Sequence, residues 1–562
     1  MTFLLVKISA ISYNHANALI DLVKSKKMAL NLNIPDLQDD PIFIAETRPQ
    51  KINQALADLK TENAMDMAAY IHAELETLNR QKVSASSRLQ ALDCYRPHLM
   101  RTALALAERY RKSALPLHDE AHLAATTAGA LWLELGYGYK LALVDLQNQL
   151  IKLGADKNSA HAIQYAMHAI AEHTLVYYQT YVMPPEYIWS DFHQLYFCAV
   201  QLDIQNISVQ HAYMATEKNI DPNLASARLV ISIENTYKHA LLMSLAEPQH
   251  LIQQDIRLIA EYLAHYIHHT QISAVTTLDN ISGAFVIDLS SNKPPTPYNK
   301  QNSQPNPLTD ILFQTIDLVR TMHQDLSQLQ RHQLPKNGSI PADANRDDYA
   351  ELLTYLIKHW GITPQRIFNR SLKNGDVDLV VGISAIWQAS EQGITKNNHT
   401  DNHPISDASS TLSIPAIPSR WKTLNISATG ILLRRHHTAE KNIRIGDLIG
   451  IKGKGEPHWS IGIIRWANCG NRDRLDIGVQ FIAPQAHSAV ATVSGRNQDE
   501  RVLLLSEIVA IKQAATIIAP RGTYEPARQL TLTYNSKIRQ IMLTKLVERS
   551  HYAERIQYSI VG

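Results

Sequence analysis

The stretch Leu475-Asp-Ile-Gly-Val-Gln-Phe-Ile482 decides the fold class of the C-terminal half, because it ends a series of short runs rich in Val and Ile. The earlier runs cover residues 377–386, 430–433, 447–451 and 459–466, and Gly, Pro and Asn lie between them. Short apolar runs separated by turn residues are typical of antiparallel strands. Their regular succession predicts a β-barrel or a β-sandwich.

Two further segments belong to this half. Residues 390–418 are rich in Ser, Asn, Thr, His and Pro, a composition that buries too little apolar surface to order itself, so we expect a disordered insertion there. Later, residues 529–534 and 537–543 form two runs joined by Asn535-Ser536, a pattern that predicts a hairpin. Residues 501–562 are therefore expected to form a short β extension.

The N-terminal half follows a different pattern. Ile52, Leu56 and Leu59 lie at helical spacing, and the same spacing recurs within 99–110, 131–143 and 251–268. Proline and glycine cluster between these segments, which marks the ends of helices. No fixed repeat period is present, so residues 49–270 are expected to form a helical bundle or array.

The remaining segments complete the expected organisation. Residues 1–48 are expected to be a disordered N-terminal extension. Residues 271–347 connect the two halves through a short β run at 284–289, proline-rich linkers and one helix at 308–330. Residues 348–500 hold a helix that ends near Trp360 and then the barrel. The fold class is multidomain α plus β, with an N-terminal all-α region followed by a C-terminal antiparallel β-barrel.

Composition and charge indicate which partners and which cellular compartment to expect. A formal net charge of +2 over 562 residues lacks the basic excess of DNA- or RNA-binding proteins, so no nucleic-acid partner is expected. Cys94, Cys198 and Cys469 are odd in number and far apart, which indicates reduced thiols in a cytoplasmic protein. No apolar run reaches the roughly 18 residues that a membrane span needs.

Two polar motifs accompany the strands. Arg366-Ile-Phe-Asn-Arg370 precedes the first run, and Asn425-Ile-Ser-Ala-Thr-Gly430 leads into the second. Each motif is weak alone, because arginines on one helix face are usually solvated and Asn, Ser and Gly are ordinary turn residues. Their order, with a strand between them and the Ile477–Phe481 run after them, is far more specific.

In this combination the sequence resembles the PilZ domain family of bacterial cyclic di-GMP receptors, whose signature is RxxxR followed by [D/N]xSxxG on a six-stranded barrel. The resemblance covers about residues 366–485. It departs from the family in the long 390–418 segment and at Gln365, where many members carry another arginine. More loosely, the run from Trp132 to Lys140 is similar to one in PilZ proteins with long helical N-terminal regions.

The resemblance implies cyclic di-GMP as the ligand, with no other cofactor, and the motif residues suit it chemically. A planar guanidinium makes paired hydrogen bonds to a phosphate or to the O6/N7 edge of guanine. The Asn425 amide can recognise a guanine edge, and Ser427 can donate to a phosphate. Gly430 is expected to take a positive φ and to bring backbone N–H groups near the anion. The expected ligand-binding residues are Arg366, Arg370, Asn425, Ser427 and Gly430.

Other candidate sites are weaker. Glu261, His265 and His269 could share a helix face, but no HExxH motif accompanies them, so a polar helix flank is preferred to a metal site. The basic run 434–437 could assist an anionic ligand, although such runs are more often solvated strand ends. No paired acids, nucleophile with its base, or phosphate loop is present, so no catalytic residue is expected.

These observations favour a receptor over an enzyme. The leading interpretation is a cyclic di-GMP receptor that relays the level of this second messenger to an unidentified protein partner through the helical region. The alternative is an interaction scaffold whose barrel no longer binds nucleotide. A hydrolase or transferase hidden in the helical half is a third possibility, but it lacks any catalytic spacing.

Overall fold

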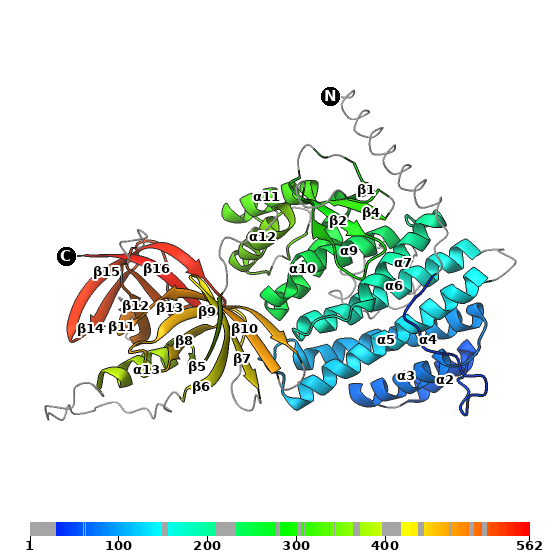
Figure 1. Cartoon of the computed structure of the whole chain (residues 1–562), viewed down its shortest axis with the longest axis horizontal. Coiled ribbons are helices and arrows are strands. Elements are labelled where there is room, and N and C mark those ends of the chain that lie inside the picture. The colour runs from blue at the N-terminus through cyan, green and yellow to red at the C-terminus, as the bar shows by residue number, and fades with distance from the viewer. Residues whose placement is uncertain are drawn as a thin grey trace, which may run out of the picture. The chain divides into compact units, whose positions relative to one another are not determined.

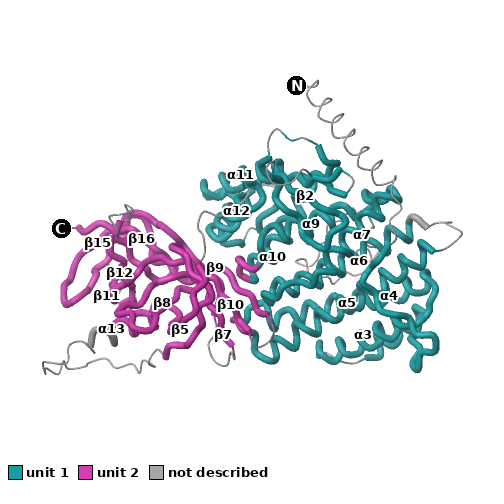
Figure 2. The backbone as a smooth tube through the Cα atoms, viewed as in Figure 1, with its two compact units in different colours: residues 1–113, 117–248, 253–365 teal, residues 114–116, 249–252, 366–562 magenta. Residues whose placement is uncertain are grey.

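The structure is a computed structural model that describes residues 30–59, 61, 63–148, 155–208, 232–276, 278, 281–299, 305–307, 309–335, 338–341, 343–362, 371–395, 417–436, 443–470, 474–493, 499–507 and 514–561. The chain divides into two compact units, shown in Figure 2. The first, called the helical unit, comprises residues 1–113, 117–248 and 253–365. The second, called the β unit, comprises residues 366–562 with the short segments 114–116 and 249–252.

Long helices build the first unit and confirm the predicted all-α region (Figure 1). The central helix, α5, packs against α3, α4 and α6. Small residues permit this packing: a Cβ at Gly138 of α5 would lie 2.5 Å from Leu92 of α4. The helices are α2 (Pro49–Asp58), α3 (Ala64–Asn79), α4 (Ala85–Tyr110), α5 (Asp119–Asn148), α6 (Ala155–Gln179), α7 (Tyr187–Gln201), α9 (Ile233–Leu245) and α10 (Gln253–Tyr266).

Residues 30–48 belong to the ordered helical unit. The backbone amides of Asn31 and Asn33 donate to Gln194 Oε1 at 2.6 Å and Asp191 Oδ1 at 2.9 Å, and Leu32 is buried. The prediction of a disordered extension is therefore wrong for residues 30–48, and residues 1–29 lie outside the described residues. Composition missed this order because buried polar side chains of α7 hold the segment.

A small sheet and two helices follow in the same unit. The strand order is β1-β4-β2-β3, and every pairing is antiparallel. The β run expected at 284–289 is confirmed as β2, but the helix expected at 308–330 begins only at Ile316, because β4 occupies the residues before it. The elements are β1 (Gln271–Ala274), β2 (Ala284–Asp288), β3 (Thr296–Pro297), β4 (Asp310–Gln314), α11 (Ile316–Gln330) and α12 (Arg346–Gly361).

The β unit contains two closed antiparallel barrels. The first has the strand order β10-β7-β6-β5-β8-β9 and confirms the predicted barrel (Figure 1). Its strands are β5 (Ser371–Val381), β6 (Ser419–Ser427), β7 (Gly430–His436), β8 (Leu448–Gly453), β9 (Ser460–Cys469) and β10 (Arg474–Ala483). Strand β6 was not predicted, although Trp421 and Thr423 alternate with exposed neighbours on it.

Helix α13 (Ile383–Thr395) replaces part of the expected strand and insertion. Gly382, with φ of 88°, ends β5 and turns the chain into the helix. Ile386 and Ala389 are buried in a cluster with residues of both barrels, including Ile461 and Leu503. The prediction of strand over 383–386 and of disorder over 390–395 is thus wrong, because α13 is stabilised by packing between the barrels. Residues 396–416 of the expected insertion lie outside the described residues.

The second barrel replaces the short β extension that was expected over 501–562. Its strand order is β11-β12-β13-β16-β15-β14, and it begins at His487, before the expected boundary. The expected hairpin is confirmed: Asn535 and Ser536, with φ of 48° and 58°, join β14 to β15. The strands are β11 (His487–Val493), β12 (Asp499–Leu505), β13 (Thr516–Pro520), β14 (Gln529–Tyr534), β15 (Lys537–Arg549) and β16 (Ala553–Ile560).

None of the helices within the described ranges is both long enough and apolar enough to cross a bilayer.

Candidate ligand site on the first barrel

The hairpin between β6 and β7 carries the three expected ligand-binding residues of the second motif. Ser427 is paired with Gly430 across the hairpin, and Asn425 is paired with Leu432. The Ser427 hydroxyl donates to the Gly430 carbonyl at 3.3 Å. The half-buried Asn425 side chain makes no hydrogen bond with any other described residue, so its amide is available to a ligand. The structure therefore brings Asn425, Ser427 and Gly430 together at one end of the hairpin.

Gly430 is a glycine for a different reason from the one predicted. Its φ is not positive, so the expectation of a left-handed turn residue is wrong. A Cβ at this position would lie 2.5 Å from the carbonyl oxygen of Val479, because β7 and β10 approach closely where Gly430 pairs with Gln480. The backbone contact between neighbouring strands thus accounts for the glycine.

The arginines of the first motif, Arg366 and Arg370, lie outside the described residues. The described chain resumes at Ser371, the first residue of β5 and the next after Arg370. Ser371 is paired with Ile426, and Leu372 is paired with Asn425. Strand β5 therefore starts directly beside the NxSxxG hairpin. Leu372 is 93% exposed, so this corner of the barrel is open among the described residues.

Pairing of β9 with β10 explains the Ile477–Phe481 run and the Trp466 before it. Gly478 pairs with Trp466, and a Cβ on Gly478 would lie 1.8 Å from the Trp466 indole nitrogen. The indole therefore occupies the space over this glycine. Between the same two strands, a Cβ on Gly462 would lie 2.5 Å from the Val479 side chain. These glycines let large side chains pack closely on the sheet.

The basic run that begins at Arg434 is largely engaged in the barrel. The Arg434 guanidinium donates to both carboxylate oxygens of Asp476, at 2.6 and 2.8 Å. The hydrogen bonds to Asp476 raise the pKa of Arg434. Arg435 lies over the buried Trp421 ring, 5.9 Å from its centroid. The charge of Arg434 is thus balanced within the barrel. Arg434 therefore stabilises the pairing of β7 with β10 and is not expected to contact a ligand.

The histidine segment near the end of α10 does not form a continuous helical face. His269 lies in a short 3-10 helix after α10, so it does not share a continuous α-helical face with Glu261. Glu261 lies 3.5 Å from Arg257, and the His269 ring contacts that of Tyr266. Within the described residues, no group of three His, Cys, Asp or Glu side chains is arranged to hold a metal ion.

The run from Trp132 to Lys140 is structural. It lies in α5, where Lys140 forms a buried ion pair with Asp191 of α7 at 2.7 Å. Glu134 pairs with Arg80, and the Tyr139 hydroxyl donates to Asp93 of α4 at 2.9 Å. Each polar residue of the run therefore joins α5 to a neighbouring element.

Comparisons with known proteins match the whole domain order. Residues 50–277 match the family "Cyclic-di-GMP receptor FimW, N-terminal domain". Residues 284–397 and 388–488 match "Cyclic-di-GMP receptor FimW, middle PilZ domain", and residues 486–561 match "FimW C-terminal beta-barrel domain". The Cyclic-di-GMP receptor FimW of Pseudomonas aeruginosa is 22% identical over 578 residues, which cover 92% of this chain and 91% of that protein. This chain therefore belongs to the PilZ-containing family with a helical N-terminal region that these three domains define.

Proposed function

We propose that this chain is a receptor that binds cyclic di-GMP at the β5 end of the PilZ barrel and carries out no catalysis itself. The family name and the PilZ match support the receptor function. The proposed ligand-binding residues are Arg366, Arg370, Asn425, Ser427 and Gly430.

One observation carries the proposal: Ser371, the residue after Arg370, is paired with Ile426, between Asn425 and Ser427. Arg370 directly precedes Ser371 in the sequence, so the described chain meets the NxSxxG hairpin at the residue that follows the first motif. We propose that the long side chain of Arg370 contacts a ligand seated against the hairpin. We therefore propose that the two motifs, separated by more than fifty residues in the sequence, act together on one ligand.

The chemistry of this corner suits a cyclic dinucleotide. Two guanidinium groups would make paired hydrogen bonds to phosphate oxygens and to guanine edges, and these charge-assisted bonds are the stronger kind. The free Asn425 amide would read a guanine edge, and the Ser427 hydroxyl would donate to a phosphate after leaving its 3.3 Å bond to Gly430. Each bidentate contact contributes roughly 1–3 kcal/mol of discrimination.

We infer that ligand binding orders the segment around Arg366 and Arg370 on the barrel and thereby changes the contact of the chain with a protein partner. A segment whose positive charges are held by a ligand is a common two-state element in signalling proteins. The helical unit is the proposed partner surface. Three free cysteines are consistent with a reducing, cytoplasmic location for this receptor.

Isothermal titration calorimetry with cyclic di-GMP tests the site. The wild-type chain is expected to bind with a Kd in the micromolar range or below, and an Arg366→Ala/Arg370→Ala variant is expected to lose at least about 100-fold in affinity, since two charge-assisted contacts disappear. Cyclic di-AMP should bind far more weakly because adenine lacks the O6 acceptor.

A matched control is Arg420→Ala, which removes an exposed arginine from β6 of the same barrel. Its affinity should equal that of the wild type. Absence of binding by the wild type would favour the scaffold alternative. Equal losses of affinity in the double variant and in Arg420→Ala would show that the loss comes from the change in net charge and not from these two arginines.

Hydrogen exchange tests the proposed ordering. Amides of residues 362–376 should gain protection when cyclic di-GMP is added, while those of β13 and β16 in the second barrel should not change. Unchanged exchange over 362–376 at saturating ligand would contradict the ordering mechanism without contradicting binding.

A further inference from the structure

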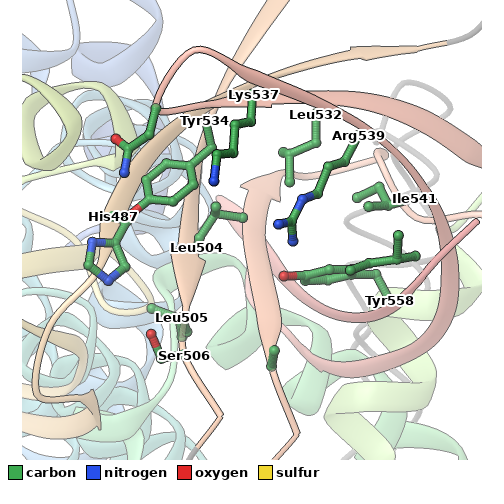
Figure 3. Close-up of a pocket in the computed structure, with 13 residues that line it drawn as sticks. His487, Leu504, Leu505, Ser506, Leu532, Tyr534, Lys537, Arg539, Ile541 and Tyr558 are labelled. Atoms are coloured by element: carbon green, nitrogen blue, oxygen red, sulfur yellow. The ribbon is translucent and has the colours of Figure 1, made fainter.

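The second barrel holds a cavity of about 300 Å³ at one end of its interior (Figure 3). Its floor is made of buried Leu504, Leu532 and Ile541, which belong to the core of this barrel. Strand alternation places residues two positions further along on the same face. Tyr534 and Arg539 therefore lie above Leu532 and Ile541, at the mouth of the barrel.

The mouth of this cavity is basic. Lys537 and Arg539 line it, and no acidic side chain is among its described lining residues. Neither Lys537 nor Arg539 forms an ion pair with another described residue. Figure 3 shows the Arg539 guanidinium directed to the same side as the Tyr558 ring. Two unpaired cations beside an apolar floor attract an anion that carries an apolar part.

Aromatic rings occupy the remaining wall. His487 and Tyr534 lie with their ring centroids 5.5 Å apart, and Tyr558 lines the cavity from β16. Burial raises the pKa of Tyr558, and the nearby Arg539 charge opposes this rise, so the two side chains share one environment. Exposed faces of tyrosine and histidine are good stacking surfaces for a planar ring, and a base stacked on an aromatic side chain is a common contact in nucleotide sites.

We propose that the second barrel binds a small anionic aromatic ligand of the nucleoside monophosphate class. Lys537 and Arg539 would hold the phosphate, and Tyr534, Tyr558 and His487 would contact the ring above the apolar floor. A volume of about 300 Å³ lies at the lower end of small-molecule sites, which suits one ring system and one phosphate. This site is distinct from the proposed cyclic di-GMP site, since Asn425, Ser427 and Gly430, the described members of that site, do not line the cavity.

Ligand-observed NMR titrations with AMP test the proposal on the full-length chain carrying Arg366→Ala and Arg370→Ala, so that the PilZ motif does not contribute. AMP is expected to bind. Adenosine and ribose 5-phosphate should each bind at least about tenfold more weakly, because each lacks one half of the recognised ligand. Absence of AMP binding, or equal binding of all three probes, would overturn the proposal.

Substitutions of cavity residues test whether AMP binds in this cavity. Lys537→Gln/Arg539→Gln should weaken AMP binding at least about tenfold through the lost phosphate contacts, and Tyr558→Leu should weaken AMP and adenosine alike. The matched control is Lys545→Gln, an exposed lysine of the same strand that does not line the cavity.

The control variant should bind AMP as the parent does. Equal losses in it and in the double variant would overturn the proposal in favour of general electrostatic attraction. In the wild-type PilZ background, Lys537→Gln/Arg539→Gln should retain cyclic di-GMP affinity, which separates failure of this proposal from failure of the receptor function.

Discussion

A methyl group at Gly430 would lie 2.5 Å from the Val479 carbonyl oxygen, whereas one at Gly375 would meet no atom within 4 Å. Both glycines lie in strands of the PilZ barrel, and neither has a positive φ. Gly→Ala restricts the backbone of the unfolded chain at both sites, so comparing the two substitutions isolates the close approach of β7 to β10.

Gly430→Ala is expected to lower the free energy of unfolding by about 1–3 kcal/mol, the usual cost of forcing an extra methyl group into a packed position. It should also weaken cyclic di-GMP binding, because the hairpin that carries Ser427 must shift. Gly375→Ala should leave both quantities nearly unchanged. Urea unfolding and calorimetry measure them, and a Gly430→Ala protein as stable as Gly375→Ala would contradict the close approach.

At the scale of elements, the Lys140–Asp191 ion pair links three parts of the helical unit. Lys140 lies in α5 and Asp191 in α7, and the backbone of Asn33 in the N-terminal segment contacts both side chains. Both charged groups are 1% exposed. Burial raises the pKa of Asp191 and lowers that of Lys140, so either charge is costly when its partner is removed.

Asp191→Ala is expected to destabilise the helical unit by about 3–5 kcal/mol, because it leaves Lys140 buried without a counter-charge. Adding Lys140→Met should restore much of that loss, since an apolar side chain needs no partner. Lys82→Ala, which removes the exposed ion pair with Asp39, is the control and should not change thermal stability. A double variant less stable than Asp191→Ala would show that Lys140 stabilises through contacts other than this pair.

Another element, α13, shows why local sequence can mislead. Ile383, Ile386 and Trp387 lie at helical spacing, but they follow a strand-like run of Val and Ile. The Trp387 indole donates to the Ala489 carbonyl at 2.9 Å, and Ser488 donates to the Trp387 carbonyl at 2.9 Å. The helix is thus held by β11, whose residues lie about a hundred positions later in the chain.

At the scale of the whole molecule, the two barrels share one core and should not fold separately. Ile386 of α13, Ile461 of the first barrel, and Leu503 and Ile518 of the second lie in one cluster, each at most 1% exposed. A buried Leu or Ile side chain contributes about 1.5–3 kcal/mol relative to exposure. Loss of several such contacts exceeds the stability margin of a small domain.

A fragment of residues 364–562 is therefore expected to unfold in a single cooperative urea transition with native near-ultraviolet circular dichroism. Fragments 364–486 and 364–500 should lack both properties, because each exposes the first-barrel side of the shared cluster. A cooperative transition in fragment 364–486 would show that the PilZ barrel is an independent domain and that the shared cluster is dispensable.

The sequence alone determined the fold class, the two motifs and the family. Helical spacing in 49–270 and short apolar runs between turn residues are local patterns, and local patterns follow directly from backbone geometry. The hairpin at Asn535-Ser536 was predictable for the same reason, since two turn residues between alternating runs specify it. The candidate site residues came from the resemblance of the two motifs to the PilZ signature and from side-chain chemistry, which need no coordinates.

Tertiary structure decided what depends on partners distant in the chain. The order of residues 30–48 rests on side chains of α7, and α13 exists because two barrels cover it. Gly430 is required by the Val479 carbonyl of another strand and not by its own φ. The cavity of the second barrel exists only once its strands close into a ring, which places Lys537 and Arg539 beside Tyr558. Such contacts arise from closure and packing, and no local pattern in the sequence encodes them.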